Sequence, residues 1–556
     1  MSALLAEASA SFPMRILPLV RGANLASGIA QPHPPPLSLT ANKTLSKYTT
    51  HTSPLPLYAI DATRRIEESY AAVLPPHTLM QRAGEAVARV ALALWPHAQT
   101  IWIAAGPGNN GGDGLEAACH LRRMGKTVVL TWLGSPERCS ADTLTSFKNA
   151  KLAGFLLEDA PPAKFDLAID ALLGIGASTG ARLLDGQVAA WAQRMNASGA
   201  PILAIDLPSG LNADTGAAAL HSVRASHTLS LVTLKPGLFT GHGRDLCGEI
   251  WFDPLGCQTD QSDLSEVNEA GELGDLRALA PICAHLSHAS PASRTFASHL
   301  SHKGSFGDVA VIGGAPGMTG AALLAARTAL HAGAGRVLVG LLDGGSMVVD
   351  PAQPELMFRQ LDGLDFNQAV VVCGCGGGDV VRAALPQILS TAPSAVFDAD
   401  ALNAIAQDTG LQALLIRRNT RGRTTVLTPH PLEAARLLGY STGEVQANRL
   451  EAAGQLAARF ACIVVLKGSG TVIAAPGQVP SINPTGNARL ATAGTGDVLA
   501  GMIGATLARN GGAKFSALDW DAAFNATAAA VYRHGQLADQ WPPNDALTAS
   551  ALASRV

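Results

Sequence analysis

A glycine-rich run near the C-terminal end has residue types that could hold a phosphate group. Gly494-Thr495-Gly496-Asp497 comes directly before an apolar stretch that is typical of a helix. Backbone N–H groups at the positive end of a helix form an anion hole, which larger side chains would block. These residues therefore predict a phosphate site, although the same letters also fit a helix start that Asp497 caps without any ligand.

The first half of the chain has a second glycine-rich turn, GPGNNGGDG, over residues 106–114. It follows an apolar run typical of a strand and precedes a predicted helix over 115–124, so its N–H groups could also face an anion. A plain tight turn would need only one or two glycines. The turn is not the dinucleotide fingerprint, and a Walker A loop is absent too, because His120 stands where that loop requires glycine.

Two acidic residues follow buried strands in the same half. Asp170 and Asp206 each come just past an apolar run and before a glycine-bearing turn. Together with Asn110 they offer several hard oxygen ligands at one sheet edge, which suits a small cation beside a phosphate. The alternative for either acid is that it caps the next helix.

Apolar spacing predicts the elements that must position these residues. A helical pattern from Leu79 leads into a buried strand over 99–104. Further strands are predicted over 127–131, 167–169, 202–205, 228–233, 308–312, 336–340, 369–373, 394–397, 424–427 and 463–466. Strands that alternate with helix-length segments indicate an α/β fold, here two three-layer α/β/α domains with mostly parallel sheets. Ligands of such folds gather beyond the carboxyl ends of the strands.

Length and composition bound the organisation of the chain. Its 556 residues exceed the roughly 250–300 that one core can serve, so two catalytic units fit. We expect a disordered or mis-started extension over 1–54, a first domain over 55–257, a linker over 258–300 and a second domain over 301–556. A targeting peptide is the weaker alternative for the extension, because no charged segment precedes a continuous apolar stretch there.

The remaining composition favours a cytoplasmic protein with small-molecule partners. A net charge of −3 gives neither the basic field that nucleic acid needs nor a polybasic membrane anchor. No apolar run reaches the roughly 18 residues of a membrane span. The eight cysteines form no C-x-x-C pair, which favours buried thiols in a reducing compartment. We also expect a homo-oligomer.

The first-half motifs resemble the YjeF N-terminal family, the epimerases of hydrated NADH and NADPH. GPGNNGGDG, DALLGIG from Asp170, DLPSG from Asp206 and TLKPG from Thr233 carry the resemblance over about residues 56–256. It implies a Rossmann-like sheet, a potassium ion on Asn110, Asp170 and Ser209, and Asp206 as the proton-transfer base. The implied substrate contacts are Asn109, Asn110, Gly111, Gly112, Asp113, Gly174, Ile175, Gly176, Ala177, Ser178, Thr179, Gly180 and Asp206.

The second half resembles the ADP- or ATP-dependent NAD(P)H-hydrate dehydratases of the ribokinase-like superfamily. KGSFGD, GGAPGMTGAA, PELM, DADALN, LTPHPLE, KGSGT and GTGD follow in this order from about residue 303. The resemblance implies ADP as co-substrate, with ATP as the alternative and Mg²⁺ as a candidate companion. The implied nucleotide contacts are Lys467, Gly468, Ser469, Gly470, Thr471, Asn487, Gly494, Thr495 and Gly496. The hydrate is expected near Ala321, Gly376, His430 and Asp497, with Asp497 as the catalytic base.

The implied reaction explains why a nucleotide is consumed. Hydroxide leaves poorly, since its conjugate acid has a pKa near 15.7, whereas phosphate has a second pKa of about 6. Phosphorylation of the C6 alcohol of the S epimer by ADP, with AMP released, therefore prepares the loss of water as phosphate.

Some residues keep a second interpretation. His430 could be a structural turn residue, and Asp398 and Asp400 could be strand-end caps or indirect metal ligands. The chain has Asn487-Ala488-Arg489 where relatives often have Asn-Pro-Gly, and GCGGG from Gly374 in place of G-P-G-L-G. These departures concern the adenine and hydrate pockets.

Two rival functions remain open from the sequence. The second half alone fits a small-molecule kinase of the same superfamily, because G-T-G-D serves phosphoryl transfer there too. The first half could also be a nucleotide-sensing or partner-binding module that is not an enzyme. The sequence leaves open whether hydrated NADH or NADPH is preferred.

Overall fold

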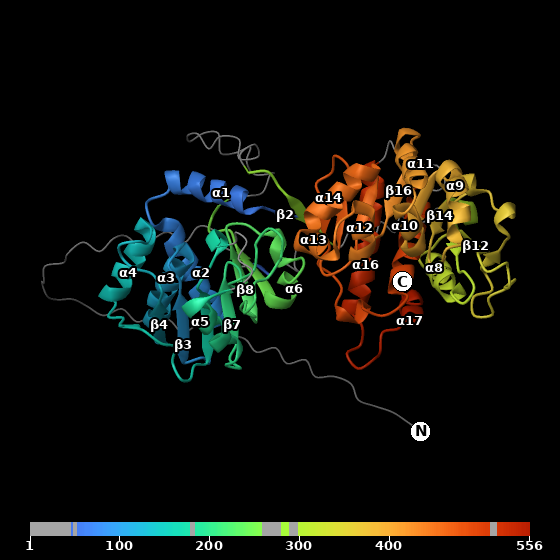
Figure 1. The fold of residues 1–556 in the computed structure, drawn as a ribbon. Coiled ribbons are helices and arrows are strands. Elements are labelled where there is room, and N and C mark those ends of the chain that lie inside the picture. Colours follow the sequence, from blue (N-terminus) through green and yellow to red (C-terminus); the bar gives the residue numbers. More distant parts are fainter. Residues whose placement is uncertain (1–45, 48–52, 178–183, 258–279, 289–298, 512–519) are drawn as a thin grey trace, which may run out of the picture. The chain divides into compact units, whose positions relative to one another are not determined.

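The computed structural model describes residues 46–47, 53–177, 184–257, 280–288, 299–511 and 520–556 (Figure 1). Two β-sheets organise these residues, and each carries one of the predicted glycine-rich sites. The residues Thr44–Val556 form one compact unit. No helix in this described part of the chain is both long and apolar enough to cross a bilayer.

The first sheet has eight strands in the order β1-β9-β8-β7-β6-β3-β4-β5, and only the pairing of β1 with β9 is antiparallel. The strands are β1 (Ser46–Lys47), β3 (Thr100–Ala105), β4 (Thr127–Trp132), β5 (Leu157–Glu158), β6 (Leu167–Ala171), β7 (Ile202–Ile205), β8 (His227–Leu231) and β9 (Glu249–Asp253). The helices are α1 (Ile60–Val73), α2 (Thr78–Leu94), α3 (Asn109–Arg123), α4 (Ala141–Leu152), α5 (Gly186–Asn196) and α6 (Gly243–Leu246), with 3₁₀ turns η2 (Ile175–Ala177) and η3 (Pro236–Leu238).

Both faces of this sheet are buried, as the continuous apolar strands predict. Alternate residues of a strand point to opposite faces. Ile101 and Ile103 of β3 therefore pack with α2 and α3, while Trp102 and Ala104 pack in a separate core with Trp191 of α5. The result is the predicted three-layer α/β/α arrangement.

The second sheet has eleven strands in the order β13-β12-β11-β14-β15-β16-β17-β18-β19-β10-β2. The strands are β2 (Leu55–Leu57), β10 (Ala284–Leu286), β11 (Asp308–Gly313), β12 (Arg336–Leu341), β13 (Met357–Phe358), β14 (Val370–Cys373), β15 (Ser394–Phe397), β16 (Thr424–Leu427), β17 (Ile463–Leu466), β18 (Val472–Ala474) and β19 (Ser481–Ile482). From β13 to β17 all neighbours are parallel.

Helices cover both faces of the second sheet as well. They are α8 (Thr319–His331), α9 (Val381–Thr391), α10 (Ala399–Ala406), α11 (Thr409–Thr420), α12 (Pro431–Leu438), α13 (Thr442–Ala447), α14 (Arg449–Phe460), α15 (Thr495–Gly511), α16 (Trp520–Asp539) and α17 (Ala549–Ala553). Val309 and Val311 of β11 lie in the core with α8 and α15, whereas Ala310 and Ile312 lie in the core on the other face.

Two short strands at the edge of the second sheet were not anticipated. β2 precedes the helices of the first domain, yet it pairs antiparallel with β10. β10 lies within the segment 258–300 that we expected to be a linker, and it pairs parallel with β19. Leu57 and Leu286 are buried there. Strands of three residues are too short for a hydrophobic period to reveal them.

One predicted helix boundary is wrong. The helix expected to begin at Leu115 begins at Asn109, so the glycine-rich turn forms its first turns. Close packing is the physical reason. A β-carbon at Gly111 would collide with the carbonyl oxygen of Gly106, and one at Gly114 would lie 2.6 Å from the Ala171 side chain. The glycines let α3 start early against β6.

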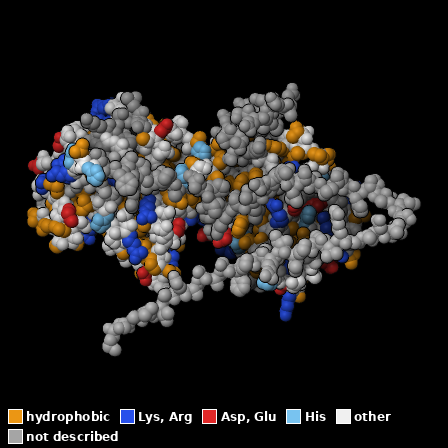
Figure 2. All heavy atoms as spheres, turned by 180° about the vertical axis from the view of Figure 1, so that it is seen from behind, with side chains coloured by type: hydrophobic (Ala, Val, Ile, Leu, Met, Phe, Trp, Pro, Cys, Tyr) orange, Lys and Arg blue, Asp and Glu red, His pale blue; other side chains and the backbone are white. Residues whose placement is uncertain are grey.

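The cysteines and the charged side chains are distributed as the composition predicts. All eight cysteines are free, and six of them are buried, which confirms the predicted buried thiols. On the face in Figure 2, Lys and Arg side chains lie interspersed with Asp, Glu and hydrophobic side chains.

Candidate active sites

The first site lies beyond the carboxyl ends of parallel strands of the first sheet, where ligands of such folds bind. Asp170 lies at the end of β6, Asp206 directly follows β7, and Lys235 lies shortly after β8. Asn110 lies in the first turn of α3, which follows β3. The parallel pairing of these strands brings residues that are far apart in the sequence to one edge.

The three predicted potassium ligands, Asn110, Asp170 and Ser209, meet around the backbone of Leu173. Asp170 accepts the Ser209 N–H at 2.8 Å and its hydroxyl at 2.7 Å. The Leu173 N–H donates to Ser209 Oγ at 2.9 Å, and Asn110 Nδ2 donates to the Leu173 carbonyl at 3.1 Å. Burial raises the pKa of Asp170 to about 6, against the hydrogen bonds from Ser209. The bonds of Asp170 go to a loop, not to a helix start, so it is no helix cap.

Asp206 forms a buried ion pair that the sequence analysis did not assign. Lys235 Nζ donates to Asp206 Oδ1, and also to the Leu231 carbonyl at 2.7 Å. The Leu231 N–H donates to the same Asp206 oxygen at 3.2 Å. Asp206 has a φ of 66°, an unusual value for a residue with a side chain. The pair fixes the Asp206 carboxylate at the strand end.

Further acidic groups lie within electrostatic range of this pair. Burial raises the pKa of Glu67 to about 7, while Lys235 lowers it and Asp206 raises it. Burial also raises the pKa of Asp113 well above its ordinary value, and the charges of Glu67, Asp206 and Glu116 raise it further. Asp113 was predicted and Glu67 was missed. Glu67 can therefore exchange a proton near neutral pH at this site.

The other predicted contacts of the first site are placed as follows. Asn109 Oδ1 accepts a hydrogen bond from the Ser140 hydroxyl at 2.6 Å, which ties it to the start of α4. A β-carbon at Gly174 would lie 3.1 Å from the β-carbon of Asn110. Gly111 and Gly112 lie in the first turn of α3, Ile175, Gly176 and Ala177 form η2, and Ser178, Thr179 and Gly180 lie outside the described residues.

The second site lies beyond the carboxyl ends of β14, β15, β16 and β17, facing the start of α15. Cys375, Asp398, Thr428 and Lys467 follow these four strands in turn. Asp497 lies in the first turn of α15, which begins at Thr495. The helix start predicted at the glycine run 494–497 is therefore confirmed.

Asp497 lies among groups that shift the pKa of its carboxyl group toward neutral pH. Burial raises the pKa of Asp497 to about 6, helped by the charge of Asp398, while the Cys375 thiol and Lys467 lower it. One ligand atom each of Cys375, Asp398 and Asp497 lie within 4.8 Å of one another. A carboxylate with this pKa can accept a proton near neutral pH.

Asp398 and Lys467 form an ion pair beside the glycine run. Lys467 Nζ lies 2.6 Å from Asp398 Oδ1, which also accepts the Thr428 hydroxyl at 2.7 Å. A β-carbon at Gly496 would lie 3.5 Å from Lys467 Nζ and 3.9 Å from Asp398 Oδ2. A cationic nitrogen and a bare helix start thus face a common space. The Asp398 side chain does not cap α10.

Asp400 holds the neighbouring loop. Its Oδ2 accepts the Gly378 N–H at 2.8 Å. A β-carbon at Gly376 would lie 2.9 Å from that of Ala321, so these two predicted hydrate contacts lie together.

His430 has the structural role that the sequence left open. Its Nδ1 accepts the Leu432 N–H at 3.1 Å, and Glu433 accepts the His430 N–H at 2.8 Å, which together cap α12. The side chain is 46% exposed. Burial raises the pKa of Glu433 to about 7.

Three predicted nucleotide contacts lie against other segments of the chain. Ser469 donates its hydroxyl to the Gly241 carbonyl at 2.8 Å, and a β-carbon at Gly470 would collide with the Phe239 carbonyl. Asn487 Nδ2 donates to the Ala538 carbonyl and to Asp539, both at 3.0 Å. Ser469 and Asn487 therefore hold loops, whereas Gly496 lies beside Lys467 and Asp398.

His534 is a further residue that the sequence did not reveal. Its Nε2 lies 3.0 Å from the Thr495 carbonyl oxygen at the start of α15. Burial lowers the pKa of His534 to about 4, so the ring is neutral at pH 7 and donates this bond. A single histidine in a helix that also carries other polar residues, such as Arg533 and Gln536, is a weak signal. For Lys235 the signal was stronger, because a lysine stands in the apolar run TLKPGLF.

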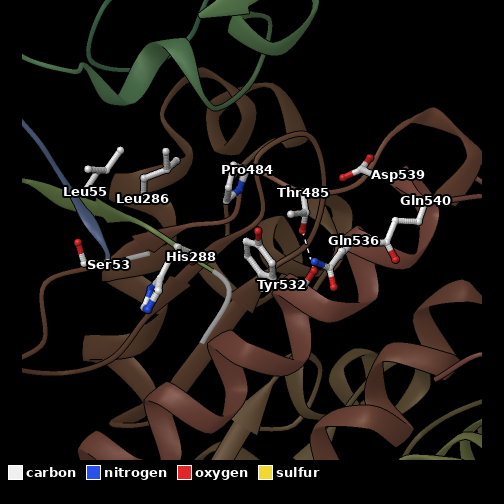
Figure 3. Close-up of a pocket in the computed structure, with 11 residues that line it drawn as sticks. Ser53, Leu55, Leu286, His288, Pro484, Thr485, Tyr532, Gln536, Asp539 and Gln540 are labelled. Atoms are coloured by element: carbon white, nitrogen blue, oxygen red, sulfur yellow. Dashed lines mark hydrogen bonds between the residues drawn. The ribbon is translucent and has the colours of Figure 1, made fainter. Parts of the chain in front are cut away.

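A cavity of about 260 Å³ lies beside the loop that leads to Asn487 (Figure 3). Tyr532, Gln536 and Asp539 of α16 line it opposite Leu55 and Leu286. Thr485 on its wall donates its hydroxyl to the Tyr532 carbonyl at 2.8 Å. None of the predicted site residues lines this cavity.

Comparisons with known proteins cover both halves. The family described as NAD(P)H-hydrate dehydratase matches residues 309–556, and the family described as YjeF-related protein N-terminus matches residues 76–237. The chain is 35% identical over 498 residues to the bifunctional NAD(P)H-hydrate repair enzyme Nnr of Escherichia coli, which covers 87% of this chain and 90% of the relative. The Coxiella burnetii enzyme of the same name is 33% identical, with 78% and 86% covered.

A solved structure also resembles the second half. It is the ADP/ATP-dependent NAD(P)H-hydrate dehydratase of Bacillus subtilis, co-crystallised with ATP and Mg²⁺. The identity is 31%, over 46% of this chain and 89% of that chain, with a TM-score of 0.35.

Proposed function

The chain belongs to the bifunctional NAD(P)H-hydrate repair enzymes, and we propose that its two sites perform two successive reactions of this repair. The first site interconverts the R and S epimers of hydrated NADH and NADPH. The second site converts the S epimer to NADH or NADPH with consumption of ADP. The observation that carries this proposal is the meeting of Asp497, the glycine run 494–496 and the Asp398–Lys467 pair at one helix start.

At the second site, Asp497 accepts the proton of the C6 hydroxyl as the alcohol oxygen attacks the β-phosphorus of ADP. The bond between this phosphorus and the bridging oxygen breaks, and AMP leaves. Lys467 and the N–H groups of residues 494–496 hold the charge of the transferred group. The lone pair of the ring nitrogen then expels phosphate from C6, and loss of a proton from C5 restores the dihydronicotinamide.

Mg²⁺ belongs to the proposal as a companion of the nucleotide phosphates. Asp398 Oδ2 faces the position of a Gly496 β-carbon and would hold the ion through water. The ion would neutralise charge on the phosphates. ADP is the proposed donor and ATP the alternative, and both share the same anion space.

At the first site, Asn110, Asp170 and Ser209 would hold potassium. A buried carboxylate, an amide oxygen and a hydroxyl are the oxygen ligands that a hard cation prefers, so the residues fit. The ion would offset the charge of Asp170 and attract a substrate phosphate. Asp206, fixed by Lys235, serves as the proton-transfer base for exchange at C6. Residues 109–113 at the start of α3 and residues 174–177 contact the substrate.

A cytoplasmic location, a homo-oligomeric state and the domain limits 55–257 and 301–556 complete the proposal. The balanced charge and the buried thiols support the location. Sedimentation of the purified chain tests the oligomeric state.

A coupled absorbance assay tests the function. Purified protein receives the R or the S epimer with ADP or ATP, and formation of dihydronicotinamide is followed for hydrated NADH and NADPH separately. We expect both epimers to be consumed with ADP. Accumulation of the phosphorylated alcohol would instead support the small-molecule kinase. Epimer exchange at the solvent rate would make the first half a binding module.

A further inference from the structure

A segment of the first half, Phe239 to Arg244, contacts the loop 467–471, for which the resemblance to the dehydratases implies ADP binding. The Gly241 N–H donates to the Ser469 carbonyl at 3.1 Å, and Ser469 returns its hydroxyl to the Gly241 carbonyl at 2.8 Å. The Thr240 hydroxyl lies 3.2 Å from the same Ser469 carbonyl and 3.3 Å from that of Gly470. Both segments belong to the unit Thr44–Val556.

Arg244 of the same segment contacts the second nucleotide loop. Its Nη2 donates to the Gly486 carbonyl at 2.6 Å, and its Nη1 donates to the Thr485 carbonyl at 3.2 Å. A third bond, from Nη1 to the Asn483 carbonyl, is long at 3.5 Å. Gly486 directly precedes Asn487, where the predicted nucleotide contacts of this loop begin.

The opposite side of this loop is held by Asp539 of α16. The Gly486 N–H donates to Asp539 Oδ2 at 2.8 Å, and Asn487 Nδ2 donates to Oδ1 at 3.0 Å. A guanidinium thus binds the carbonyl oxygens of the loop while a carboxylate binds its N–H groups. Figure 3 shows Thr485 and Asp539 on the wall of the cavity.

The loop has little room to adopt another path. Gly486 has a φ of 96°, and a β-carbon at Gly535 of α16 would lie 2.7 Å from the Gly486 nitrogen. A loop that is fixed before its ligand arrives spares the ligand the entropy cost of ordering it. A guanidinium that donates to two or three carbonyls is well suited to fix such a loop, because its planar group of donors is itself pre-organised.

We propose that Arg244, a residue of the epimerase half, is a positioning residue of the dehydratase half and raises its affinity for the nucleotide. This inference rests on the proposed function, since it takes residues 487–496 as the nucleotide loop. Arg244 bonds to backbone carbonyls of the loop that precedes Asn487, so it acts through the loop. The two halves are therefore separate in chemistry but joined in the support of one site.

The test uses the full chain with three variants, R244A, R244K and R194A. Arg194 is the matched control, because it donates to the Pro162 and Ala163 carbonyls at 3.2 and 2.6 Å within the first half. The KM for ADP and kcat are measured on the pure S epimer, ADP binding by calorimetry, and epimer exchange separately. We expect R244A to raise both the KM and the Kd for ADP about tenfold, with kcat and epimer exchange within about threefold.

The remaining variants separate positioning from general support of the fold. R244K should give a KM between those of R244A and the wild type, because an ammonium group cannot span two carbonyls as a fork does. R194A should match the wild type in every measurement. A merely structural role of Arg244 would lower kcat and epimer exchange in proportion to the fraction of folded protein, and would leave the KM and Kd for ADP unchanged.

Each failure has its own signature. Wild-type protein that turns over the S epimer, together with an R244A variant of unchanged KM and Kd for ADP, would overturn the inference and leave the proposed function intact. Wild-type protein without nucleotide-dependent turnover would overturn the proposed function first. If R244A does not fold, an R244K variant with wild-type affinity for ADP overturns the inference.

Discussion

The two sites contain ion pairs of the same type, a lysine with an aspartate, but use them in different ways. In each, a lysine contacts an aspartate at the end of a parallel strand: the buried Lys235 with Asp206 in the first, the partly buried Lys467 with Asp398 in the second. The second site adds Asp497, a separate carboxylate on a helix start beside the pair. In the first site the proposed base is the aspartate of the pair itself.

This difference assigns different tasks to the acids. Asp398 neutralises much of the Lys467 charge, which leaves Asp497 to exchange a proton, and burial raises the pKa of Asp497 to about 6. At the first site Asp206 must both balance Lys235 and act on the substrate. Replacement of Asp497 should therefore affect proton transfer alone, whereas replacement of Asp206 should also remove the charge that balances Lys235.

The largest expected effect is that of Asp497→Asn on dehydration. The amide keeps the shape and loses the base, so turnover of the S epimer should fall at least about 100-fold while ADP binding persists. Asp408→Asn is the control, since Asn serves as well as Asp in capping α11. Residual dehydration above about a hundredth of wild type would argue against Asp497 as the base.

Gly496→Val should weaken the nucleotide site by a different route. Its side chain would occupy the space beside Lys467, because a β-carbon at position 496 would already lie 3.5 Å from Nζ. We expect the Kd for ADP to rise about tenfold or more, by calorimetry. Gly454→Val is the control, because a β-carbon at Gly454 meets no other atom within 4 Å. Equal affinities in both variants would place the phosphate elsewhere.

The pH dependence of dehydration should report Asp497. The carboxylate accepts a proton only when ionised, and its pKa is raised to about 6. Turnover of the S epimer at saturating ADP should therefore be constant above pH 7 and fall about tenfold per unit well below pH 6. A rate that stays constant from pH 7 to pH 5 would contradict this role.

A smaller effect is expected for potassium at the first site. Asp170 has a pKa of about 6 in the fold against an ordinary 3.8, so its ionisation lowers stability as the pH rises through this window. At pH 7, exchanging sodium for potassium should raise the melting temperature of the wild type by about 2–4 °C. Asp170→Asn should lose this difference. The same rise in melting temperature in Asp170→Asn would show that the ion binds elsewhere.

The sequence predicted most strands closely, for a physical reason. Strands buried on both faces are continuous apolar runs, so β7, β15, β16 and β17 have the predicted limits. The run over 228–233 extends past β8, which ends at Leu231, because apolar residues continue into the buried loop that carries Lys235. Periodicity cannot separate a buried loop from a strand.

What the sequence could not show depends on contacts between distant segments. GTGD predicted an anion site, and Gly496 of this run does face Lys467 of KGSGT. The same KGSGT letters place Ser469 and Gly470 against Thr240 and Gly241, however, and no pattern within the motif indicates this. Glu67 and His534 were missed for the same reason, since each gains its role only from the groups packed around it.

The central claim, two sites with divided chemistry, has one direct test. Asp206→Ala is given ADP with pure S hydrate and with an R/S mixture, and dihydronicotinamide absorbance is followed in both. We expect wild-type turnover of the S epimer, and consumption of the mixture that slows, once S is spent, to the rate of uncatalysed epimer exchange. Equal loss of activity on both substrates would contradict it, because the first half would then only support a single active site.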